Sequence, residues 1–133
     1  MIVIGESIHV LSALVKEAIA NRDAAFIQGL AREQVEKGAN ILDLNIGPQK
    51  REGVDVMSWM VRAIQDVTDV PLSLDTTNAA AIEAGLRLCR QKALINSTDA
   101  TAERLAAMMP LAAEFGAGIV ALTLGTSGLP TSA

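Results

Sequence analysis

Short apolar runs that end in polar clusters recur five times along the chain. The runs begin at Ile2, Ile41, Pro71, Ala93 and Ile119, and carboxylate, amide or hydroxyl side chains follow each one. A short buried run bounded by turn residues is typical of a strand, and the stretches between the runs have apolar residues at helical spacing. The pattern therefore predicts β-loop-α units whose polar clusters emerge together at the carboxyl ends of parallel strands, where α/β folds place their active sites.

The expected strands are separated by helices, with two helices between the first two strands. The strands are predicted at 2–5, 40–44, 71–74, 93–95 and 119–122, and the helices at 12–20, 23–37, 54–67, 78–90 and 101–115. Asp23 is expected to cap the second helix, and Thr77 or Asn78 the fourth. Gly38 is expected to end the second helix. Pro110 lies well inside the last helix, so a kink or an early stop is predicted there. Residues 125–130 are expected to form a loop.

Two architectures use such units, the open doubly wound sheet and the (β/α)8 barrel. Strand starts lie roughly 22 to 40 residues apart, which suits right-handed crossovers between parallel neighbours. Polar groups stand at every strand exit rather than at one switch point, and this favours the barrel. A full barrel needs about 250 residues. We therefore expect the 133 residues to form one α/β domain of about five units, truncated after the fifth strand.

Composition excludes several classes of function. The chain is 50% apolar but only 2% aromatic, so its core must be aliphatic, and single-strand binders would want more aromatic side chains. The net charge of −4 and the lack of a basic stretch argue against nucleic acid. Cys89 is the single cysteine, which suits a reducing cytoplasm. The weakly charged segment 108–125 contains Pro110, Glu114 and Gly116, so we interpret it as helix, turn and strand rather than a membrane span.

Asp75 is the strongest candidate for a binding residue. A carboxylate at a strand exit can accept two parallel hydrogen bonds from a planar donor edge such as that of an aminopyrimidinone. The alternative is that Asp75 caps the following helix, but Thr76, Thr77 and Asn78 are available for that role. Asn96 occupies the equivalent position one strand along and offers one acceptor and two donors. For Asn96, turn formation remains an equally good interpretation.

Three further residues are candidates at the same edge. Asp43 and Asn45 lie two apart and share a face if the strand persists; they either line the mouth of the pocket or close the loop before Pro48. The mouth is favoured for Asp43, and Asn45 is left open. Glu6 either lines the pocket or pairs with a cation, because a buried carboxylate without a partner is costly. His9 could act as a general base, but a solvated surface position is the favoured interpretation.

Several familiar signatures are missing from the sequence. It contains no Gly-x-Gly-x-x-Gly, no Walker-type loop and no His or Cys pair at metal-ligand spacing. It also lacks a Gly-x-Ser-x-Gly elbow. A metal site is not expected, and polar groups that bind a flat ring remain the best hypothesis.

Five segments, in order and at natural spacings, resemble the methyltetrahydrofolate:corrinoid protein methyltransferases. The segments are Ile4-Gly5-Glu6-x-Ile8, Leu42-Asp43-Leu44-Asn45-x-Gly47-Pro48, Leu74-Asp75-x-Thr77-Asn78, Ala81-Ile82-Glu83-Ala84-Gly85-Leu86 and Ile95-Asn96-Ser97-Thr98. The likeness covers essentially the whole chain. This family belongs to the pterin-binding barrels, with dihydropteroate synthase and the folate module of cobalamin-dependent methionine synthase. Dihydropteroate synthase fits less well, because its Asn-x-Thr-x-Asp-Ser-Phe type loop after the first strand is replaced here by other residues.

The resemblance implies the N-terminal portion of a TIM barrel of the pterin-binding type, in a cytoplasmic enzyme of one-carbon metabolism. It implies that Asp75 and Asn96 bind the pterin ring, with Asp43, Asn45 and Glu6 in the same cleft; no catalytic residue is identified. The implied reaction moves the N5 methyl group of methyltetrahydrofolate to the Co(I) of a corrinoid, or cobalamin, carried by a partner protein. The family's remaining pterin contacts lie on later strands.

The shortness of the chain leaves two further expectations and two alternatives open. A C-terminal half could complete the barrel, or a homo-oligomer such as a dimer could form. The alternative functions are a dihydropteroate synthase-like enzyme and a non-catalytic pterin-binding or assembly module.

Overall fold

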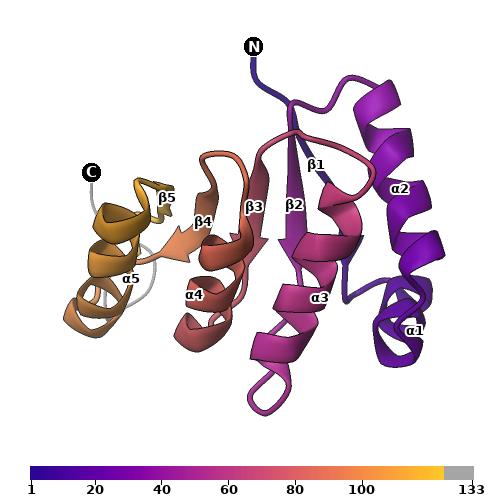
Figure 1. Ribbon diagram of the computed structural model, residues 1–133. Helices are drawn as coiled ribbons and strands as arrows, with labels where there is room; N and C mark the ends of the chain where they lie inside the picture. The colour runs from indigo at the N-terminus through magenta and orange to yellow at the C-terminus, as the bar shows by residue number, and fades with distance from the viewer. Residues whose placement is uncertain (125–133) are drawn as a thin grey trace.

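In the computed structural model, which describes residues 1–124, five parallel strands are joined by five helices, two of which lie between the first and second strands (Figure 1). The strands are β1 (Ile4–His9), β2 (Ile41–Asn45), β3 (Leu72–Asp75), β4 (Leu94–Thr98) and β5 (Gly118–Ala121). The helices are α1 (Ala13–Asn21), α2 (Ala24–Glu36), α3 (Gly53–Gln65), α4 (Ala79–Leu88) and α5 (Ala102–Phe115). The predicted α/β class and the order of its elements are confirmed.

The strands form one sheet in sequence order, β1-β2-β3-β4-β5, with every neighbouring pair parallel. The helices lie along one side of it (Figure 1). Register pairs Asn45 with Asp75 and Asp75 with Asn96, so the polar strand exits stand beside one another. Parallel strands that follow one another in sequence order, joined by crossovers of this length, are consistent with the N-terminal part of a (β/α) barrel.

Side-chain caps stand at the start of α1, α2, α4 and α5, whereas α3 begins without one. Asp23 accepts a hydrogen bond from the Phe26 amide at 3.0 Å, and Asn78 accepts one from the Ala81 amide at 3.2 Å. Each cap satisfies one of the amides that the first turn leaves without an intrahelical partner. Helix α5 continues through Pro110, so of the kink or early stop predicted there the early stop is wrong, and the kink stays a prediction. The helices are 9 to 14 residues long, and within residues 1–124 none is long and apolar enough to cross a membrane.

Alternation along the central strands separates a dry face from a polar one. The leucines at alternate positions are at most 2% exposed; they are Leu42, Leu44, Leu72 and Leu74. A Cβ added to Gly85 of α4 would lie 2.8 Å from Leu74 Cδ1, so these leucines face the helices. Because strand side chains alternate between faces, the intervening Asp43, Asn45 and Asp75 are directed to the other face. The sheet thereby buries its apolar positions under the helices and presents the polar ones together.

Strand β1 is the main departure from the expected elements. It runs from Ile4 to His9 rather than over residues 2–5, with an irregular register between Gly5 and Ile8. Glu6 therefore lies within the strand, and His9, expected in a loop, pairs with Asn45 of β2. Glu6 and His9 of β1 line the pocket and interrupt the apolar run of this strand. The strand predicted from the apolar run was therefore too short at its carboxyl end. The loop predicted at 125–130 lies outside the described residues.

Candidate functional site

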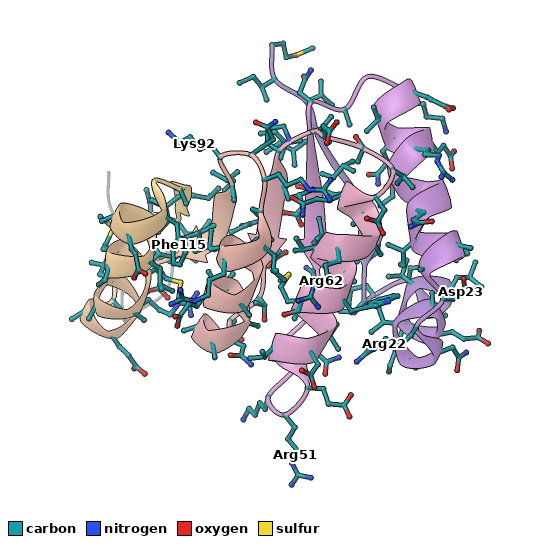
Figure 2. All side chains as sticks on the ribbon, in the orientation of Figure 1. Arg22, Asp23, Arg51, Arg62, Lys92 and Phe115 are labelled. Atoms are coloured by element: carbon teal, nitrogen blue, oxygen red, sulfur yellow. The ribbon has the colours of Figure 1, made fainter. Side chains whose placement is uncertain are left out.

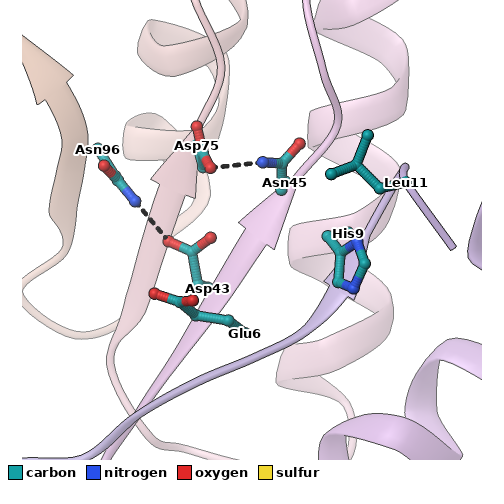
Figure 3. Close-up of a pocket in the computed structure, with 7 residues that line it drawn as sticks. All are labelled: Glu6, His9, Leu11, Asp43, Asn45, Asp75 and Asn96. Atoms are coloured by element: carbon teal, nitrogen blue, oxygen red, sulfur yellow. Dashed lines mark hydrogen bonds between the residues drawn. The ribbon is translucent and has the colours of Figure 1, made fainter.

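A pocket of about 310 Å³ opens at the carboxyl ends of the strands (Figure 3). Its lining comes from β1 to β4 and the loop after β1, and comprises Glu6, His9, Leu11, Asp43, Asn45, Asp75 and Asn96. All five residues that the sequence marked as candidates are thus brought together. His9 and Leu11 join them.

Asp43 is at the centre of a buried hydrogen-bond network. It is only 4% exposed, and its Oδ1 accepts hydrogen bonds from Ser73 Oγ at 2.5 Å and from Asn96 Nδ2 at 3.1 Å. Ser73 comes from the neighbouring strand β3 and Asn96 from β4 beyond it, so the network spans three strands and fixes the orientation of the carboxylate and of the carboxamide. Within residues 1–124, Asp43 Oδ2 and Asn96 Oδ1 accept no side-chain or backbone hydrogen bond. These two acceptor atoms are therefore available to a ligand.

Asn45 orients Asp75. Its Nδ2 donates to Asp75 Oδ2 at 2.5 Å, while its Oδ1 accepts from the Gly47 amide at 3.0 Å. Asn45 therefore does both things that the sequence left open, since it lines the pocket and also closes the loop after β2. In the described part of the chain, the other carboxylate oxygen of Asp75 has no hydrogen-bond partner and remains open to a ligand.

Neither Asp75 nor Asn96 is used to start a helix. Asn78 caps α4, and Thr76 Oγ1 donates to the Gly47 carbonyl at 2.6 Å. At the next strand exit, Thr101 caps α5. The interpretation of Asp75 as a helix cap is thus wrong.

Three carboxylates share the pocket, and no lysine or arginine lines it. Burial raises the pKa of Asp75 above its ordinary value, and the charges of Asp43 and then Glu6 also raise this pKa, while the hydrogen bond from Asn45 opposes them. Glu6 forms no ion pair within residues 1–124, so its expected alternative of pairing with a cation is not realised there. Such a pocket favours a ligand that presents N–H donors.

His9 is set apart by an unpaired nitrogen. Its Nδ1 is buried and has no hydrogen-bond partner, and among the described residues no other fully buried side-chain nitrogen or oxygen is in this state. Leaving a buried polar atom unpaired costs about 1–3 kcal/mol, so such atoms are normally satisfied. His9 is partly buried and lines the pocket, which overturns the expectation of a solvated surface histidine.

Two residues of the site had not been singled out in the sequence. Ser73 is buried and supports Asp43, and its position two residues before Asp75 was the signal that places it on the same face of β3. Leu11 is 90% exposed at the pocket's edge, and no sequence pattern indicated it. Within residues 1–124, no three His, Cys, Asp or Glu side chains are grouped so that they could hold a metal ion.

Parallel β/α units with a carboxylate-rich pocket at the carboxyl edge define an α/β protein whose pocket suits a polar, donor-bearing ligand. Residues 12–131 match the family described as pterin binding enzymes, and the chain belongs to that family.

Curated relatives agree with this membership. The chain is 30% identical over 134 residues to a methylcorrinoid:tetrahydrofolate methyltransferase of Eubacterium limosum, a match that covers 99% of the chain and 49% of the relative. It is 33% identical over 118 residues to the methionine synthase of Mycobacterium tuberculosis, covering 85% of the chain and 10% of that protein. The methionine synthase of Mycobacterium leprae is 32% identical over 122 residues, or 88% of the chain and 10% of the enzyme. The chain thus spans about half the length of the first of these relatives and a tenth of the other two.

Proposed function

We propose that this chain carries the pterin-recognising part of a methyltransferase that moves the N5 methyl group of methyltetrahydrofolate to the Co(I) of a corrinoid held by a partner protein. Membership of the pterin binding enzymes and the names of the relatives support this proposal. The name of the Eubacterium limosum relative describes transfer in the opposite direction, from a methylcorrinoid to tetrahydrofolate. Both directions pass through the same transition state, so they make the same demands on the pocket.

The observation that carries the proposal is the rim of acceptor atoms formed by Asp43, Asp75 and Asn96. A pterin presents adjacent N–H groups along one planar edge, and a carboxylate such as that of Asp75 can accept two parallel hydrogen bonds from them. The Asn96 carbonyl and the second oxygen of Asp43 offer further acceptors on the next strands, and both side chains are already oriented by hydrogen bonds. The pocket is thus preorganised for a flat ring rich in donors.

The pocket residues are assigned roles in binding and orienting the ring. The corrinoid supplies the cobalt nucleophile that takes the methyl group. A neutral tertiary amine is a poor leaving group, so N5 needs a proton or a hydrogen bond that develops as the C–N bond breaks. Holding the ring by its far edge leaves N5 and its methyl group free to face the partner.

Calorimetric titration with methyltetrahydrofolate tests the binding part of the proposal. We expect Asp75→Ala and Asn96→Ala to weaken binding by about 10- to 100-fold, the effect of losing hydrogen bonds worth about 1.5–3 kcal/mol to charged groups and somewhat less to neutral ones. Asp69→Ala is the matched control, because Asp69 is 83% exposed and does not line the pocket. Equal affinities for wild type and both pocket variants would refute the placement. Transfer of a labelled methyl group to a corrinoid protein then tests the reaction.

A further inference from the structure

A second hollow, of about 440 Å³, lies beside the ring pocket at the same edge of the sheet. It is formed between α1 and the loop that joins β2 to α3. Its polar lining is Lys16, Gln49 and Lys50, and its apolar lining includes Val10, Ile46 and Pro48. We name this hollow the basic groove. Val10 and Ile46 directly adjoin Leu11 and Asn45 of the ring pocket in sequence, so the two sites share the ends of β1 and β2 as a wall.

The lysines of the basic groove are not neutralised by neighbouring side chains. No carboxylate lines the groove, and neither Lys16 nor Lys50 forms an ion pair within residues 1–124. Both side chains are exposed. The two lysines give this hollow a positive lining in a chain whose net charge is −4. They create a local positive potential that attracts anions.

Arg22 lies near the basic groove but is not available to a ligand there. An adjoining hollow shares Val10, Lys16 and Gln49 and adds Arg22 and Glu52. Arg22 already donates to the Ile19 carbonyl at 2.9 Å and lies over the Trp59 ring at 5.3 Å, so it is held by the protein.

The remaining charged side chains near the basic groove do not line it. Arg51 projects from the loop after β2, away from the body of the domain (Figure 2). Glu52 is the nearby carboxylate, and it lines only the adjoining hollow. Lys16 and Lys50 are therefore the cations that a ligand in the basic groove would meet.

The two neighbouring sites have opposite chemistry. Three carboxylates and no lysine or arginine line the ring pocket, whereas two lysines and no carboxylate line the basic groove. This pairing fits a ligand that has a donor-bearing ring at one end and an anionic tail at the other. A folate has this construction, because its pterin is joined through a p-aminobenzoyl group to one or more glutamates.

We propose that the basic groove binds the glutamate carboxylates of the folate tail through Lys16 and Lys50, and that it makes the protein prefer polyglutamylated folates. The inference rests on the proposed function, since it assumes a folate in the ring pocket. Contacts between exposed lysines and carboxylates are individually modest and are screened by salt. The preference is therefore expected to be about three- to ten-fold at low ionic strength and to shrink as salt is added.

Calorimetry with three ligands tests the inference: 5-methyltetrahydropterin without a tail, methyltetrahydrofolate with one glutamate, and its triglutamate form. Wild type is expected to bind the triglutamate about three- to ten-fold more tightly than the monoglutamate. The double variant Lys16→Gln/Lys50→Gln should lose most of this advantage and bind the tailless pterin as wild type does. Lys37→Gln is the matched control, because Lys37 lies at the end of α2 and pairs with Glu33.

The outcomes separate this inference from the proposed function. If wild type binds the tailless pterin but shows no dependence on tail length, the basic groove has no role in folate binding. A double variant that keeps the full triglutamate preference would overturn the assignment of Lys16 and Lys50. Failure of wild type to bind any of the three ligands would refute the proposed function, and this inference with it.

Discussion

Replacement of Asp75 by asparagine should make the protein more stable at neutral pH while weakening its ligand site. Asp75 shares the pocket with Asp43 and Glu6, and burial and both charges raise its pKa. Asparagine has nearly the same shape, and its carbonyl can still accept the hydrogen bond that Asn45 donates at 2.5 Å. The substitution therefore removes a repelled charge and keeps the local geometry.

The magnitude follows from the surroundings of the carboxylate. Like charges near a protein surface repel by about 1 kcal/mol, and the partial exposure of Asp75 keeps the effect at this level. The hydrogen bond from Asn45 loses its charge-assisted part in the variant, which offsets about 0.5 kcal/mol. We expect Asp75→Asn to raise the free energy of unfolding by the difference, about 0.5 kcal/mol, at pH 7.5.

The stabilisation should depend on pH in a defined direction. The unfolded carboxyl titrates near its ordinary value of 3.8, and the folded pKa is higher. Below the unfolded pKa both states of the wild type are protonated and bear no penalty. As pH rises through the folded pKa, the folded state must accept the charge, so wild type loses stability relative to the variant. The gain in Asp75→Asn should be small near pH 4 and complete at neutral pH.

Urea unfolding of wild type and Asp75→Asn from pH 4 to pH 7.5 measures this difference. Asp69→Asn serves as the control, because Asp69 is 83% exposed and lies outside the pocket. A variant that is less stable than wild type at pH 7.5, or a gain that is largest at low pH, would contradict the electrostatic account of the pocket. Weaker binding of methyltetrahydrofolate by the same stabilised variant would show that the repulsion is retained for function.

Two further predictions concern packing and the single thiol. Gly29→Ala should stabilise the protein by about 0.5–1 kcal/mol, because nothing lies within 4 Å of the added Cβ in α2. Gly85→Ala should have a free energy of unfolding about 1–3 kcal/mol below that of Gly29→Ala, since the added Cβ would meet Met57 Cγ at 2.9 Å. Equal urea midpoints for the two variants would contradict this. Burial raises the pKa of Cys89 from 9.0 to about 11, so alkylation at pH 8 should be about a hundred-fold slower than in urea-unfolded chain, and equal rates would disprove the burial argument.

The sequence predicts those parts of the fold that depend on local chemistry. Alternation of Leu42 and Leu44 with Asp43 separates core from pocket, and the caps at Asp23 and Asn78 lie where the sequence places them. Side-chain caps act within three residues of the chain, so they need no knowledge of distant strands. The clustering of candidates follows as well, because parallel strands put their carboxyl ends at one edge.

Features that depend on pairing between distant strands were not predictable. The length of β1 and the placement of His9 beside Asn45 follow from a register that shifts between Gly5 and Ile8. No local pattern encodes that register, and the polar residues of β1 resemble a loop when they are considered alone. The role of Ser73 as the buried donor to Asp43 likewise arises only when β2 and β3 are paired.

The central claim is that the carboxyl edge of this sheet binds a pterin ring through groups on neighbouring strands. Nuclear magnetic resonance of the 15N-labelled chain, titrated with methyltetrahydrofolate, measures this most directly. We expect the largest amide shift changes at Asp43, Asn45, Asp75 and Asn96. Saturating ligand that leaves all four amides unshifted, or shifts only residues at the amino ends of the strands, would contradict it.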